Sequence, residues 1–550
     1  MSLAVTPSPR CRTSALAGAA VTLTVLVSAC SGGSGSSSGT GSEQRRLVSM
    51  SEAAKGGVDL VTWNLTSGEP DTLDPPNAAT YGGGQVVMNL CDTLVRYDAD
   101  YNLSEGLATF ERESPTKLVY RLHTAKFWDG KPVTAEDVVY SLGRAKANSV
   151  VSSFFQSVKS IRATGDKEVT VTFSEPDEKF NSEMANISGV VVEKAYAEKA
   201  GKNFGTAAGG VMCSGPFTLD QWKSGNSITM SRNDGYWDTT RIPKAKKVKF
   251  TFVTDTNALT QALDTGEIDG AYELPPNAIQ ALEKSKEGRL YFGPSTQGTG
   301  LNVANAGGAT ADPKLGAALQ RAIDREAIVK AVYHGAGQPL YTGLTPRTWP
   351  SDQTALYAKA YAKFKKVRSY DIDAAKKLVK ASSYRGQELV VAYQAGDPTI
   401  ARMAQLIQQQ AKQAGINLKL QSMGALAYQQ AGYDASKRKD MDYMFGSNFN
   451  SVADPLEPAL FNYLPNSPYN YTDYKDARTA ELLKEAVSTF DAKKRAELVI
   501  QAQDRWESVN GTIPLVATDT VTFLNKRLAG AVTSFAYWSM PNMAFIGSAK

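Results

Sequence analysis

Hydrophobic periods of two residues and of 3.6 residues alternate along this 550-residue chain. In "KKVKFTFVT", Val248 and Phe250 fall on one face of a strand. "DTNALTQALDTG" follows, with Leu259 and Leu263 at helical spacing and Gly266 as the C-terminal cap, and "EIDGAYEL" predicts the next strand. Repeated units of this kind bury a sheet between helices, so the pattern predicts an α/β fold.

The same alternation recurs in the second half of the chain. Asp312 before a proline predicts the start of one helix over "PKLGAALQRAIDREAIVKAVY", residues 313–333. "TIARMAQLIQQQAKQAG" predicts another helix, which Gly415 ends, and "INLKL" predicts a strand after it. No internal repeat of solenoid length is present.

The N-terminal 29 residues have the profile of a signal peptide. They contain Arg10 and Arg12, no acidic residue, and an apolar run of small residues from Ala15 to Ala29. We therefore expect the protein to be exported. No later segment approaches the roughly 18 unbroken apolar residues that a membrane-spanning helix needs.

The segment Val27-Ser28-Ala29-Cys30 resembles the bacterial lipobox, in which the cysteine is lipidated and becomes the new N-terminus. The alternative is a free cysteine near an ordinary cleavage site. The run "SGGSGSSSGTGS" follows and predicts a flexible tether over residues 30–57. The resemblance implies a protein anchored by acyl chains to the outer face of the plasma membrane, where stable anchoring takes more than one chain.

The charge balance argues against a nucleic-acid partner. Removal of the signal peptide lowers the formal net charge from +5 to about +3, far from the strongly basic balance of a nucleic-acid-binding protein. We expect the membrane to be contacted through the lipid anchor alone.

Four cysteines are present, and two of them, Cys91 and Cys213, lie beyond the tether. In an oxidising compartment such a pair forms either a disulfide or two buried thiols that pack as small apolar residues. The sequence leaves both alternatives open.

Catalytic and metal-binding signatures are missing. The two histidines, His123 and His334, have no spacing typical of a metal site. The single GxSxG match, residues 35–39, lies in the tether, where it cannot form a nucleophile elbow. No phosphate-binding loop of the GxxxxGK[ST] type occurs, so ATP-driven work would belong to a partner. We predict a binding protein without catalytic residues, cofactor or metal.

The stretch "FWDGKPVTAEDVVYSL", residues 127–142, concentrates acidic residues that could be mistaken for a catalytic site. Asp129 with the next glycine predicts a turn, and Thr134 with Asp137 approximates a capping box. Glu136 falls in the same first helical turn, where the helix dipole favours negative charge. These acids therefore indicate fold-building rather than catalysis.

A series of segments resembles the extracellular solute-binding proteins of family 5, the peptide-binding components of ABC importers. They occur in the family's order over nearly the whole mature chain: "EPDTLDPPNAAT", "FWDGKPVTAEDVVYSL", "CSGPFTLDQW" with "SITMSRNDGYWD", "ALDTGEID", "LQRAIDREAIV", "MAQLIQQQAKQAGI" and "FDAKKRAELVIQAQDRWESVNGTIPL".

The resemblance implies a periplasmic-binding-protein-like fold (type II, cluster C) with two lobes that close over ligand by hinge motion. Lobe I is expected at residues 58–82, 209–300 and 521–550, with an inserted subdomain at 83–208, and lobe II at 301–520. The family also implies a monomer that works with an ABC permease and its ATPase subunits.

The expected ligand contacts depart from the family pattern. In peptide-binding relatives, the segment that resembles "GSNFNSVADPLEP" has an aspartate three residues before its Asp-Pro pair, and that aspartate pairs with the peptide's ammonium. Here the position is Ser451, followed by Asp454-Pro455. The stretch "AYQAGDP", where dipeptide-binding relatives have an arginine, contains none, and Arg402 has the register of a helix surface.

Because a closed cleft penalises unpaired charges by several kcal/mol, these departures favour longer or modified peptides, or an oligosaccharide or other small solute, over dipeptides. An exported hydrolase is the alternative from another class. The residues predicted to bind ligand are Glu69, Asp71, Tyr81, Ser447, Asn448, Phe449, Asn450 and Ser451.

Overall fold

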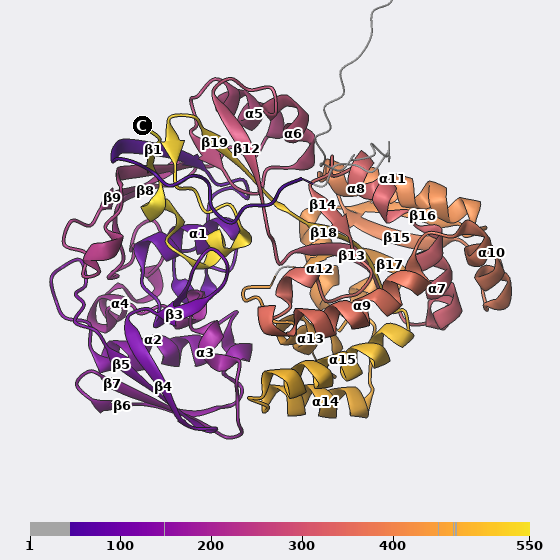
Figure 1. Cartoon of the computed structure of the whole chain (residues 1–550), viewed down its shortest axis with the longest axis horizontal. Helices are drawn as coiled ribbons and strands as arrows, with labels where there is room; N and C mark the ends of the chain where they lie inside the picture. Colours follow the sequence, from indigo (N-terminus) through magenta and orange to yellow (C-terminus); the bar gives the residue numbers. More distant parts are fainter. Residues whose placement is uncertain (1–44, 148, 449, 466, 468–469) are drawn as a thin grey trace, which may run out of the picture. The chain divides into compact units, whose positions relative to one another are not determined.

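The computed structural model describes residues 45–147, 149–448, 450–465, 467 and 470–550. A seven-stranded sheet is built from chain segments far apart in the sequence (Figure 1). In spatial order its strands are β12 (Gly288–Gly293), β19 (Thr520–Asn525), β11 (Gly270–Ala271), β1 (Val58–Asn64), β10 (Ala245–Thr251), β9 (Ser227–Arg232) and β8 (Phe217–Lys223). β1 runs parallel to β10 and β11, whereas the other pairings are antiparallel.

A six-stranded sheet forms the centre of the second half of the chain. Its strands, in spatial order, are β14 (Gly337–Pro339), β18 (Thr512–Thr518), β13 (Gly298–Val303), β17 (Tyr443–Asn448), β15 (Leu389–Gln394) and β16 (Leu418–Met423). Buried side chains of α7 (Pro313–Ala322) and α11 (Pro398–Gln413) pack on this sheet in one hydrophobic cluster.

The chain passes between the two large sheets twice. Residues 294–297 join β12 to β13, and Asp519 alone separates β18 from β19. Two short crossings of this kind leave few backbone dihedrals between the sheets, as in hinged proteins. The residue bounds that we assigned to the lobes and to the inserted subdomain stay a prediction.

A four-stranded sheet, β4 (Ala108–Ser114), β5 (Lys117–Leu122), β7 (Glu168–Phe173) and β6 (Val158–Gly165), is inserted between β1 and β8. A disulfide joins Cys91, after α1 (Tyr81–Leu90), to Cys213, before β8, with Cα atoms 4.9 Å apart. It closes a loop that contains the whole inserted sheet, and such a bridge stabilises mainly by constraining the unfolded chain.

Helices α9 (Thr354–Arg368), α13 (Leu456–Tyr463), α14 (Ala477–Val487) and α15 (Ala492–Ser508) share a separate hydrophobic cluster (Figure 1). In the described part of the chain, none of the helices is long and apolar enough to cross a membrane.

Several local predictions are confirmed. Gly266, predicted as the C-terminal cap of α5 (Thr256–Asp264), has φ of +76°, a conformation that glycine adopts readily. At the other end of this helix the side chain of Asp255 is the N-terminal cap, which we did not predict. Thr134 and Asp137 exchange the bonds of a capping box at the start of α2 (Ala135–Ala147): the Asp137 amide donates to the Thr134 hydroxyl at 3.3 Å and the Thr134 amide to the Asp137 carboxylate at 3.0 Å.

The single helix predicted over residues 313–333 is wrong. The chain forms α7 and then α8 (Arg325–Ala331), separated by Ile323 in an extended conformation. Asp324 starts the second helix by accepting the Ala327 amide at 2.9 Å, and its own amide donates to Gln410 on α11. This cap lies inside an apolar stripe that continues through both helices, so the hydrophobic periodicity did not indicate the break.

The strand predicted at "EIDGAYEL" is shorter than expected. Only Gly270 and Ala271 pair, as β11, because Glu273 has φ of +52°, outside the extended region.

Candidate functional site

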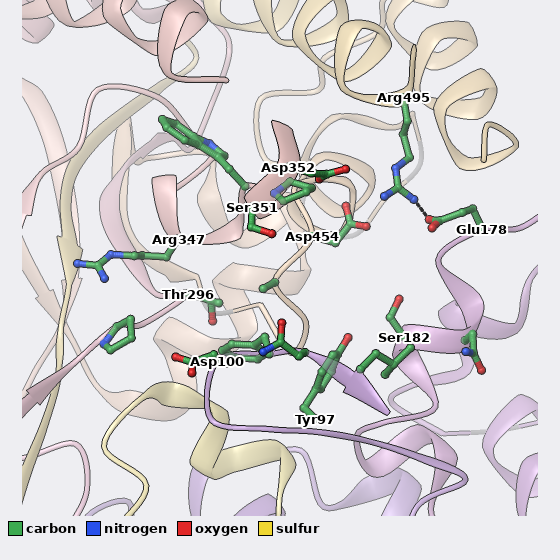
Figure 2. Close-up of a pocket in the computed structure, with 18 of the residues that line it drawn as sticks. Tyr97, Asp100, Glu178, Ser182, Thr296, Arg347, Ser351, Asp352, Asp454 and Arg495 are labelled. Carbon is green, nitrogen blue, oxygen red and sulfur yellow. Dashed lines mark ion pairs between the residues drawn. The ribbon is translucent and has the colours of Figure 1, made fainter. Parts of the chain in front are cut away.

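A cavity of about 700 Å³ opens beside the first crossing segment, Pro294 to Thr296 (Figure 2). Its walls come from the inserted region (residues 97–118 and 178–182) and from the second half of the chain (347–352, 453–454 and 490–495). A volume of this size suits a peptide or another ligand of similar bulk.

Aromatic rings supply much of the apolar wall. Tyr97 and Tyr101 make an edge-to-face pair with centroids 5.4 Å apart, and Tyr101 has φ of +63° in the turn between β2 (Val95–Tyr97) and β3 (Leu103–Glu105). On the other wall Trp349 stacks on Tyr357 with centroids 5.9 Å apart. Such faces can hold aliphatic, aromatic or sugar groups.

The three arginines that line the cavity are already engaged. Arg495 forms an ion pair with Glu178, and Arg347 lies 3.8 Å from Asp519. Arg112 donates to the carbonyl oxygen of Asp177 at 2.8 Å. Arg495 and Arg347 therefore already face carboxylates of the protein, and Arg112 is held by a main-chain carbonyl.

One lining carboxylate is in the opposite situation. Asp454 lies just before α13, where its Oδ1 accepts the Leu456 amide at 2.8 Å. Its Oδ2 has no hydrogen-bond donor among the described residues. Burial raises the pKa of this carboxyl, which the charge of Lys179 opposes. In Figure 2 Asp454 lies across the open space from Tyr97 and Ser182.

A buried acidic cluster lies behind this wall. Glu183 bonds to Lys179 at 3.2 Å, and the Ser451 hydroxyl donates to Glu457 at 2.9 Å. The amides of Ser451 and Val452 also donate to the Glu457 carboxylate, both at 3.1 Å. Burial, and then the charge of Glu183, raise the pKa of Glu457 to about 8. Burial likewise raises the pKa of Glu183, against the opposing charge of Lys179.

Comparison with known proteins shows the family of this chain. The family model described as "Bacterial extracellular solute-binding proteins, family 5 Middle" matches residues 102–472, which include most of the lining residues. The chain belongs to family 5 of the bacterial extracellular solute-binding proteins. The α/β fold predicted from the sequence is confirmed.

Individual relatives are similar over most of their length. The Glutathione-binding protein GsiB of Escherichia coli K12 is 28% identical over 512 residues, which cover 91% of this chain and 95% of that protein.

Two solved structures share the fold. The ABC transporter substrate binding protein CtaP of Listeria monocytogenes has 23% identity and a TM-score of 0.78, with 90% of this chain and all 100% of that chain covered. The periplasmic binding protein DppA of Helicobacter pylori, in complex with the peptide STSA, has 20% identity and a TM-score of 0.76, covering 90% and 99%. All three of these relatives are binding proteins rather than enzymes, as we predicted for this chain, and CtaP and DppA are associated with ABC transporters.

In this family 5 protein the predicted residues around Ser451 lie directly behind the cavity wall. Ser451 is buried and accepts a bond from Asn186 at 3.1 Å as well as bonding to Glu457. Asn450 is buried too, and its carbonyl oxygen accepts the hydroxyl of Thr296, a lining residue, at 2.7 Å. Both residues position lining segments and do not line the cavity themselves.

The remaining predicted residues of this segment lie on β17. Ser447 is exposed, and its hydroxyl lies 3.1 Å from that of Thr299 on β13. Asn448 is the last residue of the strand, and Phe449 lies outside the described residues.

Tyr81 connects the start of α1 to the first crossing segment. Its hydroxyl donates to Gln297 Oε1 at 2.6 Å, and Gln297 donates in turn to Glu273 at 2.9 Å. Burial raises the pKa of Glu273 to about 7. This chain of bonds adjoins the cavity at Thr296 and Gln297.

The structure does not bring Glu69 and Asp71 to the cavity. Glu69 accepts bonds from the Trp222 indole at 2.6 Å and from the Gly225 amide at 2.8 Å, so it fixes its loop to the β8–β9 hairpin. Asp71 is exposed. Their role in binding stays a prediction.

The two histidines and Cys30 were the other residues considered in the sequence. His123 stacks on Trp237 with centroids 5.7 Å apart, and His334 has φ of +50° just after α8. Groups of three or more His, Cys, Asp or Glu side chains suited to a metal ion are not found in the described residues. Cys30 lies outside the described part of the chain.

Sequence reasoning missed most of the lining. Asp454 was within reach, because it belongs to the Asp-Pro pair of a segment already chosen. Tyr97 and Trp349 carried no comparable signal, since Tyr97 ends the three-residue strand β2 and Trp349 lies in an irregular loop, and only the fold brings them together.

Proposed function

We propose that this protein is a lipid-anchored receptor on the outer face of the plasma membrane that captures peptides and delivers them to an ABC permease. The observation that carries the proposal is the cavity of about 700 Å³ between the inserted region and the second half of the chain, in a member of family 5. The names of two relatives support a peptide ligand, because one is a glutathione-binding protein and another is in complex with the peptide STSA.

We further infer that the two regions move as hinged bodies and close over the ligand. Ion pairs and hydrogen bonds between them support this step: Lys484 pairs with Glu175 at 2.9 Å, and the Ser488 hydroxyl donates to the Pro176 carbonyl at 3.2 Å. Arg495 and Glu178 pair on the same rim. These contacts join the two regions at their rim. They would break when the chain bends at its two crossings, residues 294–297 and Asp519, and the regions move apart.

An oligosaccharide or another small solute is the second candidate ligand. The aromatic faces of Tyr97, Tyr101 and Trp349, together with the amides of Asn102 and Asn181 on the cavity wall, favour it. Aromatic faces and amides bind the apolar and hydroxyl faces of a sugar.

Thermal unfolding of residues 31–550 in the presence of peptide pools, disaccharides or glutathione tests the proposal. This length keeps the whole compact unit that begins at Gln44. A ligand at about 100 times its Kd should stabilise the fold by roughly 2.7 kcal/mol. Stabilisation by disaccharides alone would exclude the peptide, and chemical conversion of a compound without any shift would exclude the receptor.

The anchor is tested separately in cells. Metabolic labelling with a fatty-acid analogue should mark the wild-type chain and not the Cys30→Ala variant, which should be released from the membrane. Membrane retention of unlabelled Cys30→Ala would contradict lipid anchoring.

A further inference from the structure

At the end of the cavity that contains Asp454, carboxyl groups outnumber the cations that lie near them. Three carboxylates, those of Glu183, Asp454 and Glu457, act on the hydroxyl of Tyr97, and each raises its pKa in addition to the larger effect of burial. Tyr97 and Asp454 both line the cavity. In the described part of the chain, Lys179 is the cation beside this group, and it pairs with Glu183 and also lies near Asp177.

The three carboxylates are compensated unequally. Glu183 has Lys179 as its partner at 3.2 Å, and the Lys179 ammonium also lies 5.0 Å from the centre of the Phe154 ring. Glu457 accepts the amides of Ser451 and Val452 and the Ser451 hydroxyl, so its oxygens are occupied from within the protein.

Asp454 has one backbone amide on Oδ1 and no donor on Oδ2 in the described part of the chain. It is half-buried in the cavity wall, where water compensates a charge poorly. The arginines of the cavity do not reach it, because Arg495 is paired with Glu178, Arg347 lies beside Asp519, and Arg112 donates to main-chain carbonyls.

We propose that this end of the cavity binds a positively charged group of the ligand, a primary ammonium or a guanidinium, with Asp454 as counter-ion and the Tyr97 ring on the opposite wall. A carboxylate and an aromatic ring on facing walls favour a cation over a neutral group of the same size. The inference deepens the proposed function and rests on it for the peptide nature of the ligand. A peptide can supply the charge from its amino terminus or from a lysine or arginine side chain.

The test uses residues 31–550 and random pentapeptide pools in three forms: with a free amino terminus, N-acetylated without basic residues, and N-acetylated with one lysine. Apparent affinities are measured by thermal shift. The wild-type protein should bind at least one cationic pool ten-fold or more tightly than the acetylated neutral pool. The pool that binds identifies the amino terminus or the side chain as the source of the charge.

The variant is Asp454→Asn, which keeps an oxygen for the Leu456 amide and removes the charge. It should lose ten-fold or more in affinity for the cationic pool and little for the neutral pool. The matched control is Asp255→Asn, because Asp255 also accepts a helix amide, from Ala258 at 2.8 Å, and lies outside the cavity lining. The control should change affinity by less than three-fold.

The outcomes separate this inference from the proposed function. Equal binding of the cationic and neutral pools by the wild-type protein, a comparison that needs no variant, would overturn the inference and leave the peptide receptor intact. Binding of spermidine or arginine but of no peptide, with loss in Asp454→Asn, would support the charge preference and overturn the peptide ligand. If neither cationic peptides nor these cations bind, the inference is wrong.

Discussion

Two buried groups of charged side chains differ in how fully their charges are paired within the protein. Arg368 pairs with Glu507 and donates to the carbonyls of Tyr341 and Glu507, while Glu507 also accepts the Gly343 amide at 2.8 Å. Beside the cavity, Lys179 lies near the carboxyl groups of Glu183, Asp177 and Glu457, and Asp454 keeps an oxygen without a donor in the described chain.

This difference in compensation distinguishes charges that stabilise the fold, those of Arg368 and Glu507, from a charge that a ligand could pair with, that of Asp454. The Arg368 group joins the end of α9 to the end of α15 and pairs its two charges with each other, so it serves the fold. The Asp454 group would cost folding free energy unless another cation arrived, since an unpaired buried charge destabilises the native state. Substitutions in the two groups should therefore act on stability with opposite signs.

The largest effect is expected for Arg368→Met. It leaves the Glu507 carboxylate buried without its counter-ion, which typically costs about 3–5 kcal/mol. Unfolding in guanidinium chloride measures the change. If the free energy of unfolding falls by less than about 1 kcal/mol, the Arg368–Glu507 pair does not stabilise the fold as we expect.

The next largest effect is the pH dependence caused by Glu457. Its pKa is raised to about 8 in the folded protein, so the folded state holds a proton that the unfolded chain releases near its ordinary pKa. The stability from this group is complete at about pH 4 and is lost as pH rises towards 8. Glu457→Gln should flatten the stability profile over this window by on the order of 1–3 kcal/mol.

Urea unfolding of Glu457→Gln and the wild type between pH 5 and 8.5 checks this slope. Gln keeps one oxygen for the Ser451 amide and hydroxyl but places its NH2 group against the Val452 amide. That lost hydrogen bond shifts the stability equally at every pH, so the slope of the profile, and not its offset, reports the Glu457 proton. Parallel profiles for the two proteins would contradict a protonated Glu457.

A smaller effect of opposite sign to that of Arg368→Met is expected for Asp454→Asn without ligand. Removal of the uncompensated charge should stabilise the protein by about 1 kcal/mol at pH 7. Because the pKa of Asp454 is raised by burial, the gain should shrink as pH falls and the wild-type carboxyl takes up its proton. Destabilisation at pH 7 in urea would show that Asp454 is as well compensated as Glu507.

The smallest effect is expected for Lys484→Ala on the rim. The Lys484 and Glu175 side chains are 68% and 46% exposed, so their pair should contribute less than about 0.5 kcal/mol to unfolding. If the pair stabilises the closed form, ligand dissociation in stopped flow should accelerate while unfolding stays the same. A large fall in the free energy of unfolding would show that the Lys484–Glu175 pair stabilises the fold and not only the closed form.

Much of the fold could be predicted because it depends on local rules. Gly266 predicted the end of α5, and Thr134 with Asp137 predicted the start of α2, since a cap needs only residues a few positions apart. The split between α7 and α8 was not predictable from the apolar stripe, because a cap in mid-helix leaves that stripe unchanged.

The site was predicted less well, and the residues show why. Asn450 and Ser451 were placed near the cavity by their segment, but they contact Thr296 and Glu457 instead of lining it. Glu69, predicted to bind ligand, accepts a hydrogen bond from Trp222, 153 positions away in the sequence. Side-chain partners at such separations are invisible to periodicity and spacing.

The sequence by itself determined the α/β class, the family, the absence of familiar catalytic motifs and the replacement of an expected aspartate by Ser451. Only the tertiary structure decided which carboxylates surround that serine and which one is left without a counter-ion. The physical reason is that burial and pairing set the behaviour of a charge, and both depend on residues that the fold brings together from Lys179 to Glu457.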